Sequence, residues 1–319
     1  MRSRETVVKK NASSYRRAVR EISRPQFDIL ALLERQKEGK VLTQRVIAKA
    51  VGLSVGTVNK TLTQLFEAKL VDRTAITITQ RGMDALEPFR VHRAVFLAAG
   101  FGERLIPITL NTPKPLVRVK GTRIIDTLLD AVVAADIKEI YIVRGYLGEQ
   151  FDQLLYKYPE IRFFENPAYN AANNIASVMC VRDRLQNAYV FESDLLLCNP
   201  GLITKYQYRS NYLAVPVEVT DDWCFEVKNG VISKFKLGGR NCYHMFGISY
   251  WNREDGAKLA EHIKKVYEMP GGRERYWDQI ALEYFIKDYD VEVRECGFDE
   301  IVEIDTVPEL RKQDKTYCV

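Results

Sequence analysis

The chain has 319 residues, of which 46% are hydrophobic and 28% charged, an ordinary composition for a folded protein large enough for two domains. No apolar run approaches the roughly 20 residues of a membrane-spanning helix, and the basic N-terminus lacks the apolar segment of a signal peptide. We therefore expect a cytoplasmic protein with no membrane partner. Residues 1–90 carry 18 Lys/Arg against 9 Asp/Glu, whereas the remainder carries 29 against 33, which predicts two domains with different partners.

The first domain begins with a helical pattern over residues 24–38 and continues with two short helices. Thr43 is expected to cap a helix that ends near Val51, and Ser54 to cap a second helix that ends near Ala68. Gly52 lies between them, and two helices joined by a tight glycine turn are typical of a helix-turn-helix.

The β-prone stretch "LVDRTAITIT" follows, and residues 22–89 then resemble the winged-helix domains of MarR-like regulators. This resemblance implies DNA binding, with the second helix in the major groove and the basic arm on phosphates. The residues expected to face DNA are Thr57, Asn59, Lys60 and Thr63. A protein-interaction or dimerisation module is the alternative, and such a domain often brings a homodimer. We expect a basic arm over 1–21, the winged helix-turn-helix over 22–90, and a second domain over 91–319.

The second domain alternates apolar β-rich runs with helical stretches, from "RAVFLAA" to "AYVFESDLLL". This pattern predicts an α/β fold, a Rossmann-like, mostly parallel sheet flanked by helices. From about residue 211 three short β-prone segments predict a mixed-sheet extension, with Asn229-Gly230 as a hairpin turn. The six cysteines form no Cys-x-x-Cys pair, and we expect them and His244 to be core or surface residues.

A glycine loop follows the first strand of this domain in "FLAAGFGERLIPITLNTPKPL". It is not a dinucleotide fingerprint, because Leu105 occupies the third glycine position, and no Gly-Lys-Ser/Thr makes it a P-loop. The loop, with Arg104 and the later Pro113-Lys114, resembles the signature of nucleotidyltransferases that activate sugar phosphates and related phosphomonoesters.

Small residues let backbone N–H groups approach a nucleotide, and this role is expected of Ala99, Gly100 and Gly102. Leu97 and Ala98, which precede them in the signature, are also expected to bind the nucleotide. Arg104 and Lys114 are the expected catalytic cations, because a guanidinium and an ammonium neutralise phosphate charge. Glu103 departs from the family pattern, in which many members carry Ser or Thr, so a side-chain phosphate contact is not expected there.

Four further motifs make residues 92–312 similar to bacterial LicC-type CTP:phosphocholine cytidylyltransferases: Gly145-Tyr146, Asn173-Asn174-x-x-Ser177, Tyr276-Trp277-Asp278 and Glu303-Ile-Asp305. The resemblance implies that Gly145, Tyr146, Asn173 and Ser177 bind the nucleotide. It also implies that Asp194 and Asp305 bind Mg²⁺, which prefers hard oxygen ligands.

In such an enzyme a second substrate, the acceptor, receives the nucleotidyl group. It is expected to bind to aromatic and carboxylate side chains, namely Glu192, Trp223, Tyr276, Trp277, Asp278 and Glu303. Packing of the aromatics in the core is the alternative. The resemblance implies CMP transfer from CTP to phosphocholine, a small phosphorylated amino-alcohol. Two alternatives stay open: the same chemistry on 2-aminoethylphosphonate, phosphoethanolamine or a sugar 1-phosphate, and a transcription regulator that senses a nucleotide through this domain.

Overall fold

The computed structural model describes residues 22–36 and 42–318, so the predicted basic arm lies outside the described residues. The chain divides into two compact units, Met1–Arg90 and Val91–Val319, and each is described by itself.

The first unit is a helix-turn-helix followed by a short wing. Its elements are α2 (Arg24–Glu34), α3 (Gln44–Val51), α4 (Val55–Glu67), β1 (Val71–Asp72), β2 (Thr77–Ile78) and α5 (Gln80–Leu86). The Thr43 side chain accepts a hydrogen bond from Val46 N–H, and the Ser54 side chain accepts one from Thr57 N–H. Gly52 ends α3 at a left-handed φ of 67°. Both predicted caps and the glycine turn are therefore confirmed.

The second unit is built on a central sheet, and within residues 91–318 its seven strands follow the order β10-β12-β11-β8-β3-β6-β7. Strands β8, β3, β6 and β7 run parallel, which confirms the predicted fold class. The sheet strands are β3 (Arg93–Ala98), β6 (Glu139–Arg144), β7 (Ile161–Glu165), β8 (Ala188–Glu192), β10 (Asn211–Lys228), β11 (Val231–Trp251) and β12 (Glu292–Glu295).

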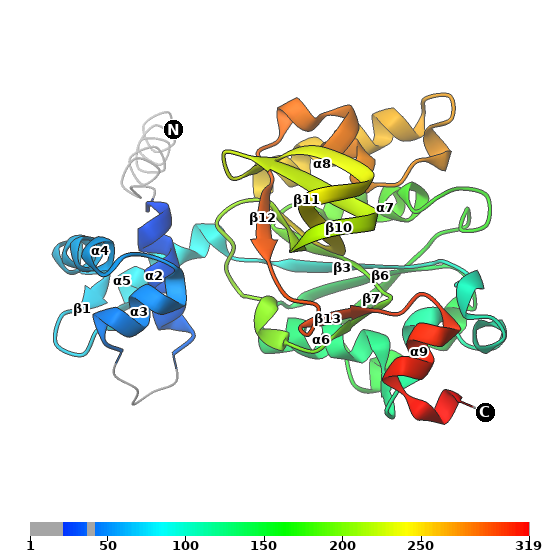
Figure 1. Cartoon of the computed structure of the whole chain (residues 1–319), viewed down its shortest axis with the longest axis horizontal. Helices are drawn as coiled ribbons and strands as arrows, with labels where there is room; N and C mark the ends of the chain where they lie inside the picture. The colour runs from blue at the N-terminus through cyan, green and yellow to red at the C-terminus, as the bar shows by residue number, and fades with distance from the viewer. Residues whose placement is uncertain (1–21, 37–41, 319) are drawn as a thin grey trace, which may run out of the picture. The chain divides into compact units, whose positions relative to one another are not determined.

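Helices cover both faces of this sheet (Figure 1). They are α6 (Ile124–Ala134) on one face, and α7 (Ile175–Val181) and α8 (Arg253–Tyr267) on the other. Strand β3 alternates between the two cores, since Phe96 packs in the core that includes α6 and Val95 in the core that includes α7 and α8. A strand buried on both faces reads as a continuous apolar run, which is why "RAVFLAA" was recognisable.

Within residues 91–318, two smaller sheets lie outside the main sheet, and one of them contains a strand from the C-terminal segment. Strand β9 (Leu195–Leu197) pairs with β13 (Ile301–Glu303), while β4 (Arg118–Val119) pairs with β5 (Thr122–Arg123), and α9 (Val307–Gln313) follows β13. Glu303 lies opposite Leu195, and Ile304 N–H donates to the Asp194 carbonyl at 3.2 Å. The two segments that carry Asp194 and Asp305 are therefore held side by side.

The extension beyond residue 211 differs from the prediction of three short strands. Strands β10 and β11 form one long hairpin, whose turn residues Asn229 and Gly230 have φ values of 55° and 81°, as a type I′ turn requires. The register shifts between Thr220 and Trp223, and such a bulge breaks the side-chain alternation, so one strand resembled two in the sequence. In the part of the chain that the structure describes, no helix has the length and apolar character needed to cross a membrane.

Candidate active site

A cleft of about 920 Å³ opens where β3 and β8 end. Ligands are expected at this edge of an open α/β sheet, and parallel pairing sets Leu97 beside Glu192 there. The predicted site residues that line the cleft are Leu97, Ala98, Ala99, Gly100, Gly102, Arg104, Lys114, Asn173, Ser177, Glu192, Asp194, Trp223, Tyr276, Asp278, Glu303 and Asp305.

Three predicted site residues are not among the lining residues. Trp277 is only 1% exposed, and its ring lies among core aromatics, which corrects the expectation that it contacts the acceptor. A Cβ at Gly145 would lie 2.7 Å from Tyr169 Cβ, so glycine is needed for Tyr169 to pack there. The Tyr146 ring lies 4.2 Å from that of Phe101. Gly145 and Tyr146 therefore contact residues that line the cleft, and their role in nucleotide binding stays a prediction.

Lys114 is the buried cation of the cleft. Its Nζ lies 2.9 Å from Asp194 Oδ2 and also pairs with Asp305, whose other oxygen lies 2.8 Å from Arg104 Nη1. Burial by itself lowers the pKa of Lys114, but the two carboxylates outweigh it and raise this pKa, so the ammonium stays charged. A Cβ at Gly102, whose φ is 72°, would lie 3.0 Å from Lys114 Cβ, so this glycine leaves room for the lysine.

The carboxylates of Asp194, Glu303 and Asp305 form an oxygen-only group in which the candidate ligand atoms lie within 4.8 Å of one another. Asp194 Oδ1 is buried and has no hydrogen-bond partner in the described residues. Burial, followed by repulsion from Asp194, Asp305 and Asp222, raises the pKa of Glu303 to about 9. Crowded oxygens with an orphaned acceptor fit a hard divalent cation such as Mg²⁺.

Two further carboxylates, those of Asp278 and Glu192, line the cleft. Asp278 accepts a hydrogen bond from Tyr212 Oη at 2.8 Å, and burial raises its pKa to about 7. Burial, with repulsion from Asp278 and other carboxylates, also raises the pKa of Glu192, which accepts a hydrogen bond from Asn174 Nδ2 at 3.3 Å. Gly247 lies so close to Glu192 that a Cβ there would be 2.4 Å from Oε2. These buried acids lack a cationic partner within residues 42–318, and a positively charged ligand would supply one.

Aromatic side chains form a wall beside these acids. The Trp223 ring stacks on the Phe235 ring with centroids 4.6 Å apart. The Tyr276 ring meets the Trp223 ring edge to face, with centroids 5.6 Å apart. All three residues line the cleft, which gives a cationic ligand aromatic surface next to carboxylates.

The asparagine pair braces the loop that carries Tyr276. Asn174 Oδ1 accepts from Trp277 N–H at 2.8 Å, and Asn173 Nδ2 donates to the Glu274 carbonyl at 3.3 Å. Ser177 Oγ accepts from Asn166 Nδ2 at 3.0 Å. The Asn173-Asn174 pair therefore connects the start of α7 to the loop that carries Tyr276, and both asparagines also line the cleft.

Comparisons with known proteins agree with this geometry. Residues 93–208 match the family described as Nucleotidyl transferase. A 2-aminoethylphosphonate cytidylyltransferase from Lancefieldella rimae is 34% identical over 228 residues, which cover 70% of this chain and 92% of that protein. The chain belongs to the nucleotidyl transferase family.

Other relatives in this family cover the same region. A choline-phosphate cytidylyltransferase from Streptococcus pneumoniae is 34% identical over 230 residues, covering 70% of this chain and 97% of that protein. The solved structure of CTP:phosphocholine cytidylyltransferase (LicC) from Streptococcus pneumoniae is similar with a TM-score of 0.66 and 32% identity, covering 71% of this chain and 99% of that one. The second unit is therefore a nucleotidyltransferase.

In the first unit, residues 21–76 match the model of the MarR family. All four predicted DNA-facing residues are exposed on α4. Two of their hydroxyl groups are already engaged within the helix: Thr57 Oγ1 lies 2.8 Å from Ser54 Oγ, and Thr63 Oγ1 donates to the Asn59 carbonyl at 3.0 Å. Asn59 and Lys60 are therefore the side chains best placed to reach a ligand.

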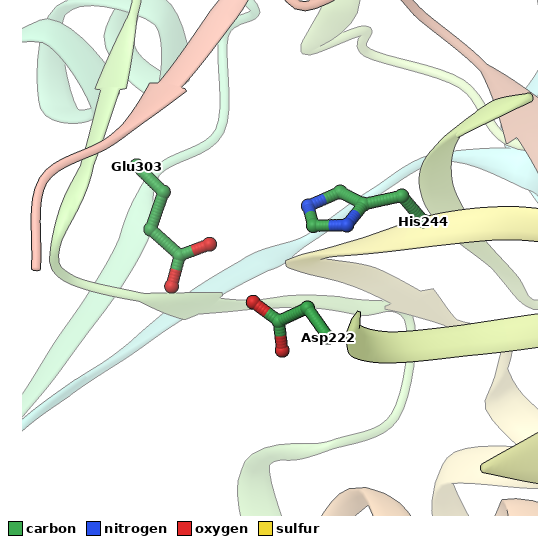
Figure 2. Close-up of side chains that lie close together, drawn as sticks. All are labelled: Asp222, His244 and Glu303. Carbon is green, nitrogen blue, oxygen red and sulfur yellow. The ribbon is translucent and has the colours of Figure 1, made fainter. Parts of the chain in front are cut away.

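Sequence reasoning missed several residues of the nucleotidyltransferase site. Asn166, Tyr169 and Asn174 line the cleft, and Asn174 was visible in the asparagine motif without an assigned role. Asp222, directly before Trp223, also lines the cleft. His244, which was expected to be a core or surface residue, has its ring beside Asp222 and Glu303 (Figure 2).

Proposed function

We propose that the second unit transfers CMP from CTP to phosphocholine, giving CDP-choline and pyrophosphate. The observation that carries this proposal is that one cleft is lined by two kinds of groups. Lys114 and Arg104 supply positive charge beside the glycine loop, and the same cleft is lined by the aromatic rings of Trp223 and Tyr276 and by buried acids. The cations suit a triphosphate, and the aromatic rings with the acids suit a small cationic acceptor.

The reaction needs no covalent enzyme intermediate. An oxygen of the acceptor phosphate attacks the α-phosphorus of CTP, a new P–O bond forms, and the bond to the β-phosphate oxygen breaks with release of pyrophosphate. The protein positions both substrates and offsets the developing negative charge, and Lys114 and Arg104 are the cations placed to do so.

We propose Mg²⁺ as the cofactor, held by Asp194 and Asp305. The buried, unpartnered Asp194 Oδ1 supports this assignment, because an orphaned acceptor lacks a ligand. When bound, Mg²⁺ would supply positive charge to the triphosphate.

The buried acids Glu192 and Asp278 support a cationic acceptor over a sugar 1-phosphate, because a bound cation would stabilise their ionised forms and a neutral sugar would not. The Trp223 and Tyr276 rings favour the quaternary ammonium of phosphocholine. A second candidate, 2-aminoethylphosphonate, or equally phosphoethanolamine, is favoured by Glu192, whose one hydrogen bond among the described residues is the 3.3 Å contact from Asn174. A primary ammonium donates three hydrogen bonds and could satisfy this acid directly.

Pyrophosphate release with CTP and a panel of acceptors tests the proposal. The highest kcat/KM is expected with phosphocholine, and a higher value with 2-aminoethylphosphonate or phosphoethanolamine would transfer the assignment to the second candidate. Preference for a sugar 1-phosphate would overturn it, and tight operator binding without any turnover would favour a nucleotide-sensing regulator.

We also propose that the first unit binds duplex DNA through the exposed face of α4, and that the enzyme works in the cytoplasm. The exposure of Asn59 and Lys60 and the match to the MarR family support the first point. The six cysteines, all unpaired thiols, suit a reducing compartment.

A further inference from the structure

A second group of metal-ligand side chains lies beside the oxygen-only group. Asp222 comes from β10, His244 from β11 and Glu303 from the end of β13, and one candidate ligand atom of each lies within 4.8 Å of the others. In Figure 2 the two carboxylates and the imidazole ring point toward one shared space. The group differs from a mere acidic cluster because it contains an imidazole nitrogen.

One hydroxyl group contacts both the His244 ring and the backbone that carries Asp222. Thr220 Oγ1 lies 3.1 Å from His244 Nδ1 and accepts a hydrogen bond from Asp222 N–H at 3.2 Å. When Nδ1–H donates to Thr220, Nε2 keeps a free lone pair, which is the form of histidine that binds metals. Ligand histidines characteristically use their second ring nitrogen for such an orienting hydrogen bond.

The carboxylates of this group have little else to bind. Within residues 22–36 and 42–318, the Glu303 side chain has no ion pair or hydrogen bond, and the Asp222 carboxylate accepts only from Trp223 N–H, at 2.6 Å. Lys114, the buried cation of the cleft, is already paired with Asp194 and Asp305. Among the described residues, the Asp222 and Glu303 side chains therefore have no cationic partner.

We propose that Asp222, His244 and Glu303 bind a first-row divalent transition-metal ion, of the class of Zn²⁺ or Mn²⁺, at a site that adjoins the oxygen-only group and shares Glu303 with it. A mixed nitrogen and oxygen ligand set suits these ions, whereas Mg²⁺ takes oxygen ligands. Glu303 belongs to both groups, and a shared carboxylate is a feature of sites that hold two neighbouring ions. Three protein ligands leave coordination positions open, and Asp222 and Glu303 line the cleft, so a ligand in the cleft could fill them.

Equilibrium dialysis of the full-length protein against Zn²⁺, in excess Mg²⁺ to occupy oxygen-only sites, tests this assignment. His244→Gln is expected to weaken Zn²⁺ binding by about tenfold or more. His262→Gln is the matched control, because His262 also has a nearby carboxylate, with Nε2 3.9 Å from Asp288, and it should bind Zn²⁺ like the wild type.

Asp222→Asn provides a second variant at an exposed position, where misfolding is not expected, and it should weaken Zn²⁺ binding in the same direction. The absorption spectrum of bound Co²⁺ should change in His244→Gln and stay unchanged in His262→Gln. Equal Zn²⁺ affinity in wild type, His244→Gln and Asp222→Asn would overturn the proposal. A raised KM for the acceptor with unaltered Zn²⁺ binding would also overturn it and assign the group to acceptor binding.

Discussion

The Lys114 ammonium lies 2.9 Å from Asp194 Oδ2 and reaches Asp305 on its other side, although these three residues are far apart in the sequence. The contact depends on the pairing of β9 with β13, which brings the segments that carry the two aspartates together. Lys114 is therefore a fixed, buried charge at the point where the glycine loop meets the candidate metal ligands.

Removal of this charge should affect turnover far more than folding. Lys114→Ala is expected to lower kcat for pyrophosphate release by about 100-fold or more, because a preorganised charge in a cleft cannot be replaced by water. Lys138→Ala is the control, since the Lys138 side chain is 77% exposed, and it should retain full activity. Near-wild-type turnover of a folded Lys114→Ala protein would refute the catalytic role.

Substitution of a candidate metal ligand should raise the Mg²⁺ concentration that the enzyme needs. Asp194→Asn removes one charge from the oxygen-only group, so a higher Mg²⁺ concentration should be needed for half-maximal activity. A chelator should abolish the activity of the wild type. Unchanged Mg²⁺ dependence in Asp194→Asn would exclude Asp194 as a ligand.

Acceptor binding should depend on pH through Asp278. Burial raises the pKa of this acid from 3.8 to about 7, so the carboxylate is neutral below this value and negative above it. A cationic acceptor prefers the negative form, and kcat/KM for the acceptor should therefore rise as pH increases through about 7.

Asp278→Asn should flatten this rise and lower kcat/KM for the acceptor, whereas Asp290→Asn, at an exposed position, should keep the wild-type profile. If kcat/KM fell across the same pH range in the wild type, Asp278 would not be the acid that attracts the acceptor.

The first unit should bind duplex DNA with strong dependence on salt, because contacts between lysine and phosphate release counterions. Lys60→Ala should reduce the slope of log K against log salt concentration by about 1 if Lys60 contacts a phosphate. Exposed Lys69, which lies beyond the end of α4, provides a control substitution that should leave the slope closer to wild type. Fluorescence anisotropy with labelled duplex DNA and the full-length chain measures the affinity and its salt dependence for each variant. Absence of binding at low salt would refute the DNA-binding role of the first unit.

Local signals in the sequence predicted much of the fold. Thr43 and Ser54 precede apolar helical patterns, and Asn229-Gly230 separates two β-prone runs, so each could be assigned from its neighbours alone. The glycine loop and Lys114 were recognisable because, with Arg104 and Pro113, they resemble the nucleotidyltransferase signature, and the spacing excludes a dinucleotide fingerprint and a P-loop.

The homodimer expected from the winged helix stays a prediction.

Long-range contacts could not be predicted in this way. Trp277 and Tyr276 are neighbours in one motif, yet only Tyr276 lines the cleft, because the orientation of each side chain depends on how the loop packs on α7. His244 lies beside Asp222 and Glu303 because of the bulge in β10 and the β9–β13 pairing, and the local sequence does not show that these features bring the three residues together.

The central claim is that this cleft joins a cytidylyl group to a small cationic phosphoester. ³¹P NMR of the purified chain with CTP, Mg²⁺ and phosphocholine tests it most directly, because it detects the new diphosphate linkage and free pyrophosphate together. We predict that both signals appear in equal amounts and only when the acceptor is present. Absence of a linked product with phosphocholine, 2-aminoethylphosphonate and phosphoethanolamine alike would contradict the claim.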